Sequence, residues 1–177
     1  MSDDRAVVDS SLTLSLPARF VLDRVLPTPG ELAYGYRLAW ITPEVAVSLA
    51  LAGLGVVPDP PTAYEELALL LSDRFDQVPD LMNELEGEAG PTGRDARVWL
   101  FLALSWIYDH RTEFSDPFSN VEQLYDDFDY PEEIEGFVRF LPVAEGVPTG
   151  AAALYGRWSE YLEAAGAEYR RRSPGRD

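Results

Sequence analysis

The sequence predicts an all-α protein, built as a single compact multi-helix domain with few or no strands. Apolar residues repeat at spacings of three and four along several segments, which is the period of a helix with one buried face. Helix-start signals, in which a threonine or an aspartate precedes a proline or an acidic residue, recur along the chain. With 177 residues, of which 46% are hydrophobic, the chain is long and apolar enough for one domain with a sizeable core.

The start of the chain is expected to be only partly helical. Residues 1–11 are predicted to form a disordered lead. Residues 12–16 alternate apolar and polar side chains, which is a weak strand signal. A short helix is then expected over residues 17–26, where Phe20, Val21, Arg24 and Val25 have helical spacing. The segment over residues 28–41 is expected to begin a helix at its proline, because the fixed φ of proline suits the first helical position.

The tripeptide Thr42-Pro43-Glu44 marks the start of the next helix. Thr42 suits the cap, Pro43 the first helical position, and Glu44 the positive end of the helix dipole. This helix should end near Gly53 or Gly55. Apolar residues lie on nearly every face of it, so we expect it to be central and buried.

A capping box is expected to begin the helix that follows. Thr62 and Glu65 have the spacing of such a box, and the apolar period continues over residues 63–76. Pro79 is predicted to interrupt this helix, because proline removes a backbone donor and clashes with the preceding turn. Residues 80–86 are expected to add one or two further turns.

The second half of the chain shows four further helical segments after a glycine-rich loop over residues 87–93. The first is expected over residues 94–110, opened by Thr92 or Gly93, and the second over residues 117–127, opened by Asp116 and Pro117, with Ser119 and Glu122 as a second capping box. A short helix should begin at Pro131, capped by Asp129 or Tyr130. The last helix is expected over residues 151–171. The helical domain should therefore span residues 12–172, with a frayed tail over residues 173–177.

The charge balance restricts the expected partners. Lysine and arginine number 14 against 31 aspartates and glutamates, which gives a formal net charge of −17. A phosphate backbone or an anionic membrane surface requires basic residues, so we expect neither nucleic acid nor membrane as a partner. The acidity favours a basic protein partner, although it also serves solubility alone.

Cysteine content and hydropathy bear on the compartment. The chain has no cysteine, which excludes disulfides and thiolate chemistry. Its N-terminus lacks the basic and apolar regions of a signal peptide, and its apolar runs are shorter than the ~20 residues that cross a bilayer. We therefore expect a cytoplasmic protein.

Motifs that would indicate an enzyme are sparse. His110 is the only histidine, and its place at the end of a predicted helix is typical of a capping role. A calcium loop beginning at Asp127 fails, because Glu132 occupies the position that needs glycine and Val138 the position that needs glutamate. We therefore expect no catalytic residue, no metal and no cofactor. A carboxylate-based metal hydrolase stays open as an alternative.

The stretch over residues 120–142 combines acidic and large apolar side chains. Ten acidic residues and one arginine lie between positions 109 and 135. Unpaired charges are costly to bury, so the stretch should present an acidic surface outwards and an apolar surface inwards. The residues expected to bind a partner are Asp126, Asp127, Asp129, Tyr130, Glu132, Glu133 and Glu135. The alternative is that the aromatic rings belong to the core and the carboxylates form a solvated face.

Two segments carry a family resemblance. Residues 28–50, TPGELAYGYRLAWITPEVAVSLA, and residues 121–142, VEQLYDDFDYPEEIEGFVRFLP, together resemble a bacterial family of small acidic proteins (domain of unknown function 2247). The segment YGRWSEYL over residues 155–162 also fits. The family's members are proposed immunity proteins of polymorphic toxin systems. The resemblance therefore implies a protein that neutralises a toxin by binding it.

The acidic stretch and the resemblance lead to one hypothesis and two alternatives. The hypothesis is a stoichiometric inhibitor, an immunity protein, that binds a basic cognate toxin such as a nuclease through its acidic, aromatic face. The first alternative is a helical adaptor or scaffold for another basic partner. The second is the metal hydrolase described above.

Overall fold

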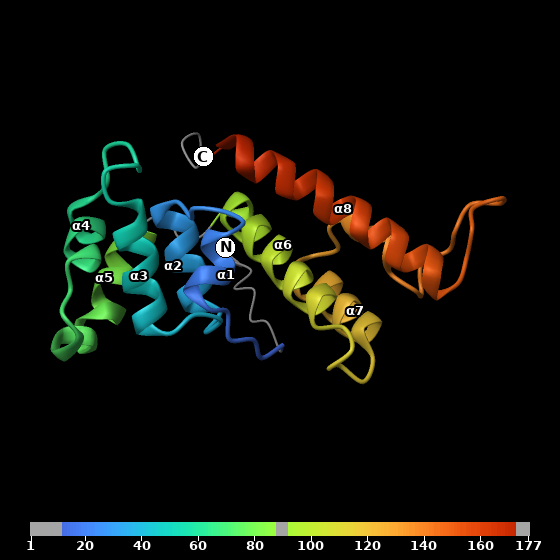
Figure 1. Ribbon diagram of the computed structural model, residues 1–177, viewed down its shortest axis with the longest axis horizontal. Coiled ribbons are helices and arrows are strands. Elements are labelled where there is room, and N and C mark those ends of the chain that lie inside the picture. Colours follow the sequence, from blue (N-terminus) through green and yellow to red (C-terminus); the bar gives the residue numbers. More distant parts are fainter. Residues whose placement is uncertain (1–11, 88–91, 173–177) are drawn as a thin grey trace, which may run out of the picture.

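The computed structural model describes residues 12–87 and 92–172, and every regular element within them is a helix (Figure 1), which confirms the all-α prediction. The elements are α1 (Ala18–Leu22), α2 (Pro29–Arg37), α3 (Pro43–Gly53), α4 (Thr62–Ala68), the 3-10 helix η1 (Ser72–Gln77), α5 (Val78–Glu86), α6 (Gly93–Asp109), α7 (Pro117–Asp127), the 3-10 helix η2 (Glu132–Phe137) and α8 (Ala151–Arg172). The predicted lead over residues 1–11 and tail over residues 173–177 lie outside the described residues.

The helices form two groups that are joined by α6. In Figure 1, α1 to α5 gather at one end, while α7 and the start of α8 lie at the other. Helix α2 packs against α3, α5 and α6, and α6 in turn packs against α7 and α8. Residues 98–105 of α6 are all buried, so this helix supplies apolar surface to both groups.

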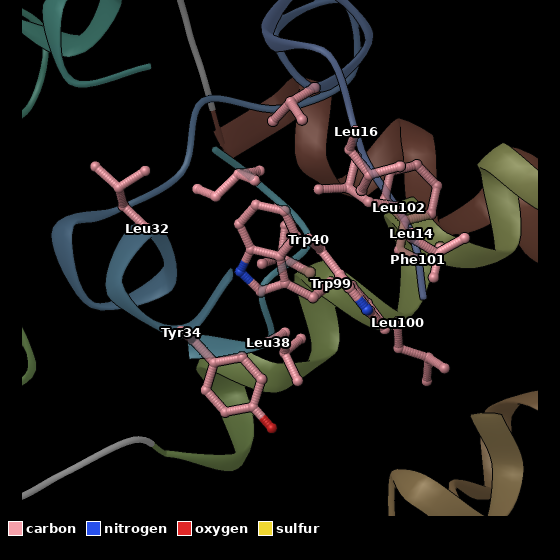
Figure 2. Close-up of a cluster of buried hydrophobic side chains, with 14 of the residues drawn as sticks. Leu14, Leu16, Leu32, Tyr34, Leu38, Trp40, Trp99, Leu100, Phe101 and Leu102 are labelled. Carbon is pink, nitrogen blue, oxygen red and sulfur yellow. The ribbon is translucent and has the colours of Figure 1, made fainter. Parts of the chain in front are cut away.

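The contact between α2 and α6 depends on Trp99 and on a glycine. Trp99 is fully buried, and its indole N–H donates a hydrogen bond of 2.6 Å to the backbone carbonyl of Glu31. A Cβ at Gly35 would lie 2.0 Å from the indole ring, so only glycine allows this approach. Figure 2 shows Trp99 beside Trp40 in the buried cluster between these elements.

The buried carboxylate of Glu31 ties the two ends of the described chain together. Glu31 is 1% exposed and completes the capping box of α2 by accepting a hydrogen bond from the Thr28 amide. Arg172, in the last turn of α8, binds the same carboxylate through two hydrogen bonds of 2.6 and 2.7 Å. This two-point geometry is the strong form of the arginine–carboxylate pair.

An aromatic cluster attaches α8 to the rest of the protein. Trp158 is fully buried, stacks on Phe137 at 5.6 Å between ring centroids, and meets Tyr108 edge-on at 5.3 Å. Phe118 and Tyr155 complete the cluster. Because these rings come from α6, α7, η2 and α8, they fix η2 against both long helices.

Helix starts are the local features that the sequence predicts best. Thr28, Thr42, Thr92 and Asp116 each occupy an N-cap position and accept a hydrogen bond from a backbone amide three residues on. The side chain of each cap satisfies a backbone donor that has no partner within its helix.

Two expectations for the first half of the chain are wrong. Residues 12–16 are extended and alternate in burial, but they join no sheet among the described residues. The Leu16 amide donates a hydrogen bond to the Trp40 carbonyl, and the Trp40 indole N–H donates one to the Leu12 carbonyl. Helix α3 is not buried on every face, because Leu51 is 54% exposed.

The region after α3 also differs from expectation. Thr62 begins α4 without capping it, and α4 ends at Ala68 instead of continuing to residue 76. Pro79 lies in the first turn of α5, so it helps to begin a helix instead of interrupting one. The break after Ala68 turns the chain back, which lets α5 pack against both α4 and α2.

The acidic stretch contains two further differences in capping. Ser119 and Glu122 form no capping box, because the Glu122 carboxylate binds Arg139. Neither Asp129 nor Tyr130 caps η2, which has no side-chain cap. Both residues instead belong to the turn that ends α7.

The glycine at position 35 provides a test of the contact between α2 and α6. Gly35→Ala should lower the free energy of unfolding by about 3 kcal/mol, because the added methyl group overlaps the Trp99 ring. Gly156→Ala is the matched control, since position 156 lies in α8 with nothing within 4 Å of its Cβ. That change should raise stability by ~0.5–1 kcal/mol. Urea unfolding followed by circular dichroism measures both, and equal effects would contradict the close approach.

The Glu31–Arg172 pair provides a second test. Arg172→Met should lower stability by about 3 kcal/mol, near the low end for a broken buried pair, because the guanidinium is 34% exposed while Glu31 is left buried without its cation. The control is Arg171→Met, one residue earlier on an exposed position. Thermal and urea unfolding measure the loss of stability in each variant. An equal loss in the two variants would show that the Glu31–Arg172 pair does not stabilise the fold.

Candidate partner-binding site

The predicted binding residues lie on the turn that ends α7 and on η2, which we call the acidic turn (residues 126–135). The turn is closed by two backbone hydrogen bonds, from Tyr130 N–H to the Tyr125 carbonyl at 2.8 Å and from Asp129 N–H to the Asp126 carbonyl at 3.2 Å. These two bonds define a Schellman motif, the common way in which helices end. The geometry of the turn is therefore fixed by the backbone.

Asp129 and Tyr130 occupy left-handed backbone conformations. Their φ angles are 58° and 56°. A side chain costs about 1–2 kcal/mol in this region, somewhat less for aspartate, and glycine is the usual residue at the position of Asp129. The protein thus places a carboxylate and a phenol where folding alone would favour a smaller residue, and both side chains are exposed.

Some acidic residues of the wider stretch are neutralised by the protein's own arginines. Arg139 binds Glu122 at 2.8 Å and Asp116 at 2.9 Å, and Arg24 binds Asp109 at 2.7 Å. Partial desolvation favours the neutral carboxyl of Asp116, but hydrogen bonds from Arg139 and from the Ser119 amide outweigh it and lower the pKa of Asp116. These carboxylates have internal partners, so they are poor candidates for binding another molecule.

Two carboxylates of the acidic turn are held by tyrosine hydroxyls. Tyr130 donates to Asp126 at 2.6 Å, and Tyr125 donates to Glu135 at 2.9 Å. The bond to Asp126 raises the pKa of Tyr130, while burial and the bond to Glu135 raise the pKa of Tyr125. Both phenols stay protonated at neutral pH. They orient the two carboxylates.

The remaining predicted residues differ in their surroundings. Glu133 lies 3.7 Å from Arg97, whose side chain is 71% exposed, so this ion pair is loose. Asp127 is only partly exposed. Asp129 and Glu132 are exposed, and the side chain of neither has a hydrogen bond or an ion pair with the residues that the structure describes.

The aromatic residues of the stretch divide between core and surface. Tyr125 is 5% exposed and belongs to the core, whereas Tyr130 and Phe140 are 54% and 61% exposed. Both exposed rings meet Tyr125 edge-on, at 5.3 and 5.9 Å between centroids. Phe128 is half-buried and packs on Trp40 at 5.9 Å. Tyr130 is thus the aromatic residue that the acidic turn itself presents.

A cleft of about 440 Å³ opens beside the acidic turn. It lies between the turn, the first turns of α6 and the side chain of Tyr34 from α2. Its lining residues are Tyr34, Thr92, Gly93, Ala96, Arg97, Leu100, Phe128, Asp129, Pro131, Glu132 and Glu133. The sequence does not identify this cleft, because its walls come from segments about 30 to 60 residues apart.

Tyr34 is unusual among the lining residues. It is 4% exposed, and its hydroxyl has no hydrogen-bond partner among the described residues. Burial raises the pKa of Tyr34 to about 12, with Arg37 opposing and Asp95 adding to that effect. Buried hydroxyl groups nearly always have a partner, so this one is a specific feature of the cleft.

The acidic side chains do not converge into a metal site. Among the residues that the structure describes, no three histidine or acidic side chains are grouped so that they could hold an ion. The geometry therefore gives no particular support to the metal hydrolase alternative.

Within residues 12–87 and 92–172, no helix has both the length and the apolar character needed to span a bilayer.

The fold and the site define an acidic, all-α protein that displays carboxylates on a helix-terminal turn. The model of a family described as an uncharacterized protein conserved in bacteria (DUF2247) matches residues 18–166, and the chain belongs to this family. The match includes the acidic turn and every residue that lines the cleft. No curated protein and no solved structure matches the chain.

The backbone of the acidic turn provides a test of its cost. Asp129→Gly should raise the free energy of unfolding by about 0.5–1 kcal/mol, because glycine adopts the left-handed conformation without strain. Ala39→Gly is the matched control: residue 39 has a φ of 57° at the same position of the motif that ends α2, and it is exposed. Urea unfolding should show a gain for both variants. Loss of stability at position 129 alone would show that the Asp129 carboxylate supports the fold.

Proposed function

We propose that the protein is a stoichiometric inhibitor that binds a basic protein, as an immunity protein neutralises a bacterial toxin in the cytoplasm. The observation that carries this proposal is the acidic turn. The hydroxyls of Tyr130 and Tyr125 hold the carboxylates of Asp126 and Glu135 in place, while the carboxylates of Asp129 and Glu132 have no internal partner among the described residues. The family itself is uncharacterized, so membership in it is consistent with this function without specifying it.

The rigidity of the acidic turn supports a role in binding. Charged side chains that are fixed before association lose little conformational freedom when a partner binds. The Schellman hydrogen bonds fix the backbone, and the tyrosine hydroxyls fix Asp126 and Glu135.

Electrostatics supports a basic partner in particular. The net charge of −17 attracts a cationic protein at long range, and such steering raises association rates by about 10- to 1000-fold at low salt. Nuclease toxins are one suitable class, because their active sites must be basic to hold phosphate. In this proposal the protein supplies no catalytic residue and needs no cofactor.

Tyr130 is the expected anchor within the acidic turn. Its ring is 54% exposed, and the hydrogen bond to Asp126 limits its motion. Exposed, restrained aromatic residues often contribute most of the binding energy at the centre of an interface. Tyr125, which is buried, is expected to support this ring instead of contacting the partner.

Charge reversal tests the proposal directly. In the triple variant, Asp126, Asp129 and Glu132 are each replaced by lysine. This variant should no longer protect cells against the cognate toxin, for which the product of the neighbouring gene is the candidate. It should also slow association by at least about tenfold at low salt, because the three changes reduce the formal charge of the acidic turn from −6 to 0. The control triple is Glu66→Lys, Asp80→Lys, Glu84→Lys, on exposed positions of α4 and α5 at the other end of the molecule. Both triples change the net charge equally.

Co-purification at physiological salt, growth assays and circular dichroism provide the measurements. Equal loss of protection in the two triples, with both folded, would mean that total charge matters and that the acidic turn does not. Association with a basic protein that is not a toxin would support the adaptor alternative. A neighbouring product that is not a toxin and does not associate would contradict the proposal.

A further inference from the structure

We propose that the cleft beside the acidic turn receives an arginine side chain of the basic partner. This inference rests on the proposed function, because it names the group by which the partner is held. It adds Tyr34, Leu100 and the first turns of α6 to a site that the sequence places only on the acidic turn.

The charge of the cleft selects a cation. Three carboxylates, from Asp129, Glu132 and Glu133, line it against the single guanidinium of Arg97. Arg97 is 71% exposed and lies 3.7 Å from Glu133, so it leaves the other two carboxylates uncompensated. An anionic ligand at the start of α6 would meet this excess of negative charge, although helix starts ordinarily attract anions.

The apolar wall of the cleft suits the stem of a long side chain. Ala96, Leu100, Phe128 and Pro131 form this wall, and the volume of about 440 Å³ admits one such chain with its flanking backbone. The methylene groups of arginine bury well against apolar surface while the charged head stays among polar groups. Phe128 offers a ring on which a guanidinium can stack.

The hydroxyl of Tyr34 distinguishes arginine from a simple cation. Figure 2 shows the Tyr34 ring pointing away from Trp40 and Trp99, with its oxygen towards the start of α6. The hydroxyl is buried and has no partner among the described residues. A guanidinium presents five N–H donors in a planar fork, so it can donate to the phenol oxygen and to a carboxylate at the same time. An ammonium group is a compact point charge that fits this arrangement less well.

The full-length protein can be titrated with a minimal probe. N-acetyl-arginine amide should shift the backbone amide signals of Gly93, Ala96, Arg97 and Glu132 saturably in ¹⁵N-correlated NMR spectra. N-acetyl-citrulline amide has nearly the same shape without the charge, and it should leave these signals in place. The lysine derivative should bind more weakly. Absence of saturable shifts, or equal shifts with citrulline, would overturn the inference.

Two variants separate the role of the hydroxyl from the fold. Tyr34→Phe should raise the melting temperature, because it removes a buried hydroxyl that has no partner among the described residues. The same change should lower the affinity for the arginine probe by about tenfold, which corresponds to one charge-assisted hydrogen bond. Tyr36→Phe, on the same helix but away from this cleft, should leave the affinity unchanged. Glu132→Gln, at an exposed position, should also weaken the probe. Full affinity in both Tyr34→Phe and Glu132→Gln would overturn the assignment.

The failure of this inference is distinct from that of the proposed function. The probe measurements need no partner protein, so saturable binding of the arginine probe supports the cleft even where no toxin is found. Conversely, a partner that depends on the acidic turn and binds Tyr34→Phe with wild-type affinity would contradict the arginine anchor and leave the proposed function intact.

Discussion

The contact of Trp99 with the backbone of α2 is the constraint on which the rest of the structure depends. The absence of a side chain at Gly35 lets the indole reach the Glu31 carbonyl, and the Glu31 carboxylate in turn caps α2 and receives Arg172. One turn of α2 therefore positions both α6 and the end of α8. Helix α7 is positioned in turn by its contact with α6. The acidic turn follows from this arrangement, because η2 packs on α7 and α8.

Local signals in the sequence predicted several helix starts, although the same signal at Thr62 predicted a capping box that does not form. The capping threonines Thr28, Thr42 and Thr92 act within three residues of themselves, so their helix starts were predicted correctly. The end of α4 was not predicted, because the pattern of leucines continues past Ala68, whereas the chain turns there and brings α5 against α2 and α4. The same limit applies to Pro79, whose effect depends on where the preceding helix ends.

The candidate site shows a similar division. The exposure of Asp126, Asp129 and Glu132 followed from composition, since unpaired charges are costly to bury. The composition did not show which carboxylates are neutralised, because the arginine that neutralises Asp109 is Arg24, which lies 85 positions away in the sequence. The cleft and Tyr34 were not predicted for the same reason: their significance arises only when α2, α6 and the acidic turn meet.

The position of the acidic turn at the end of α7 has an electrostatic consequence. The C-terminal end of a helix carries the negative pole of its macrodipole, and α7 has no basic residue in its last turn. Asp126 therefore adds negative charge where the helix is already negative. In the proposed complex, a cation of the partner would supply the counter-charge that the last turn of α7 does not contain, and would complete the helix terminus as well as join two surfaces.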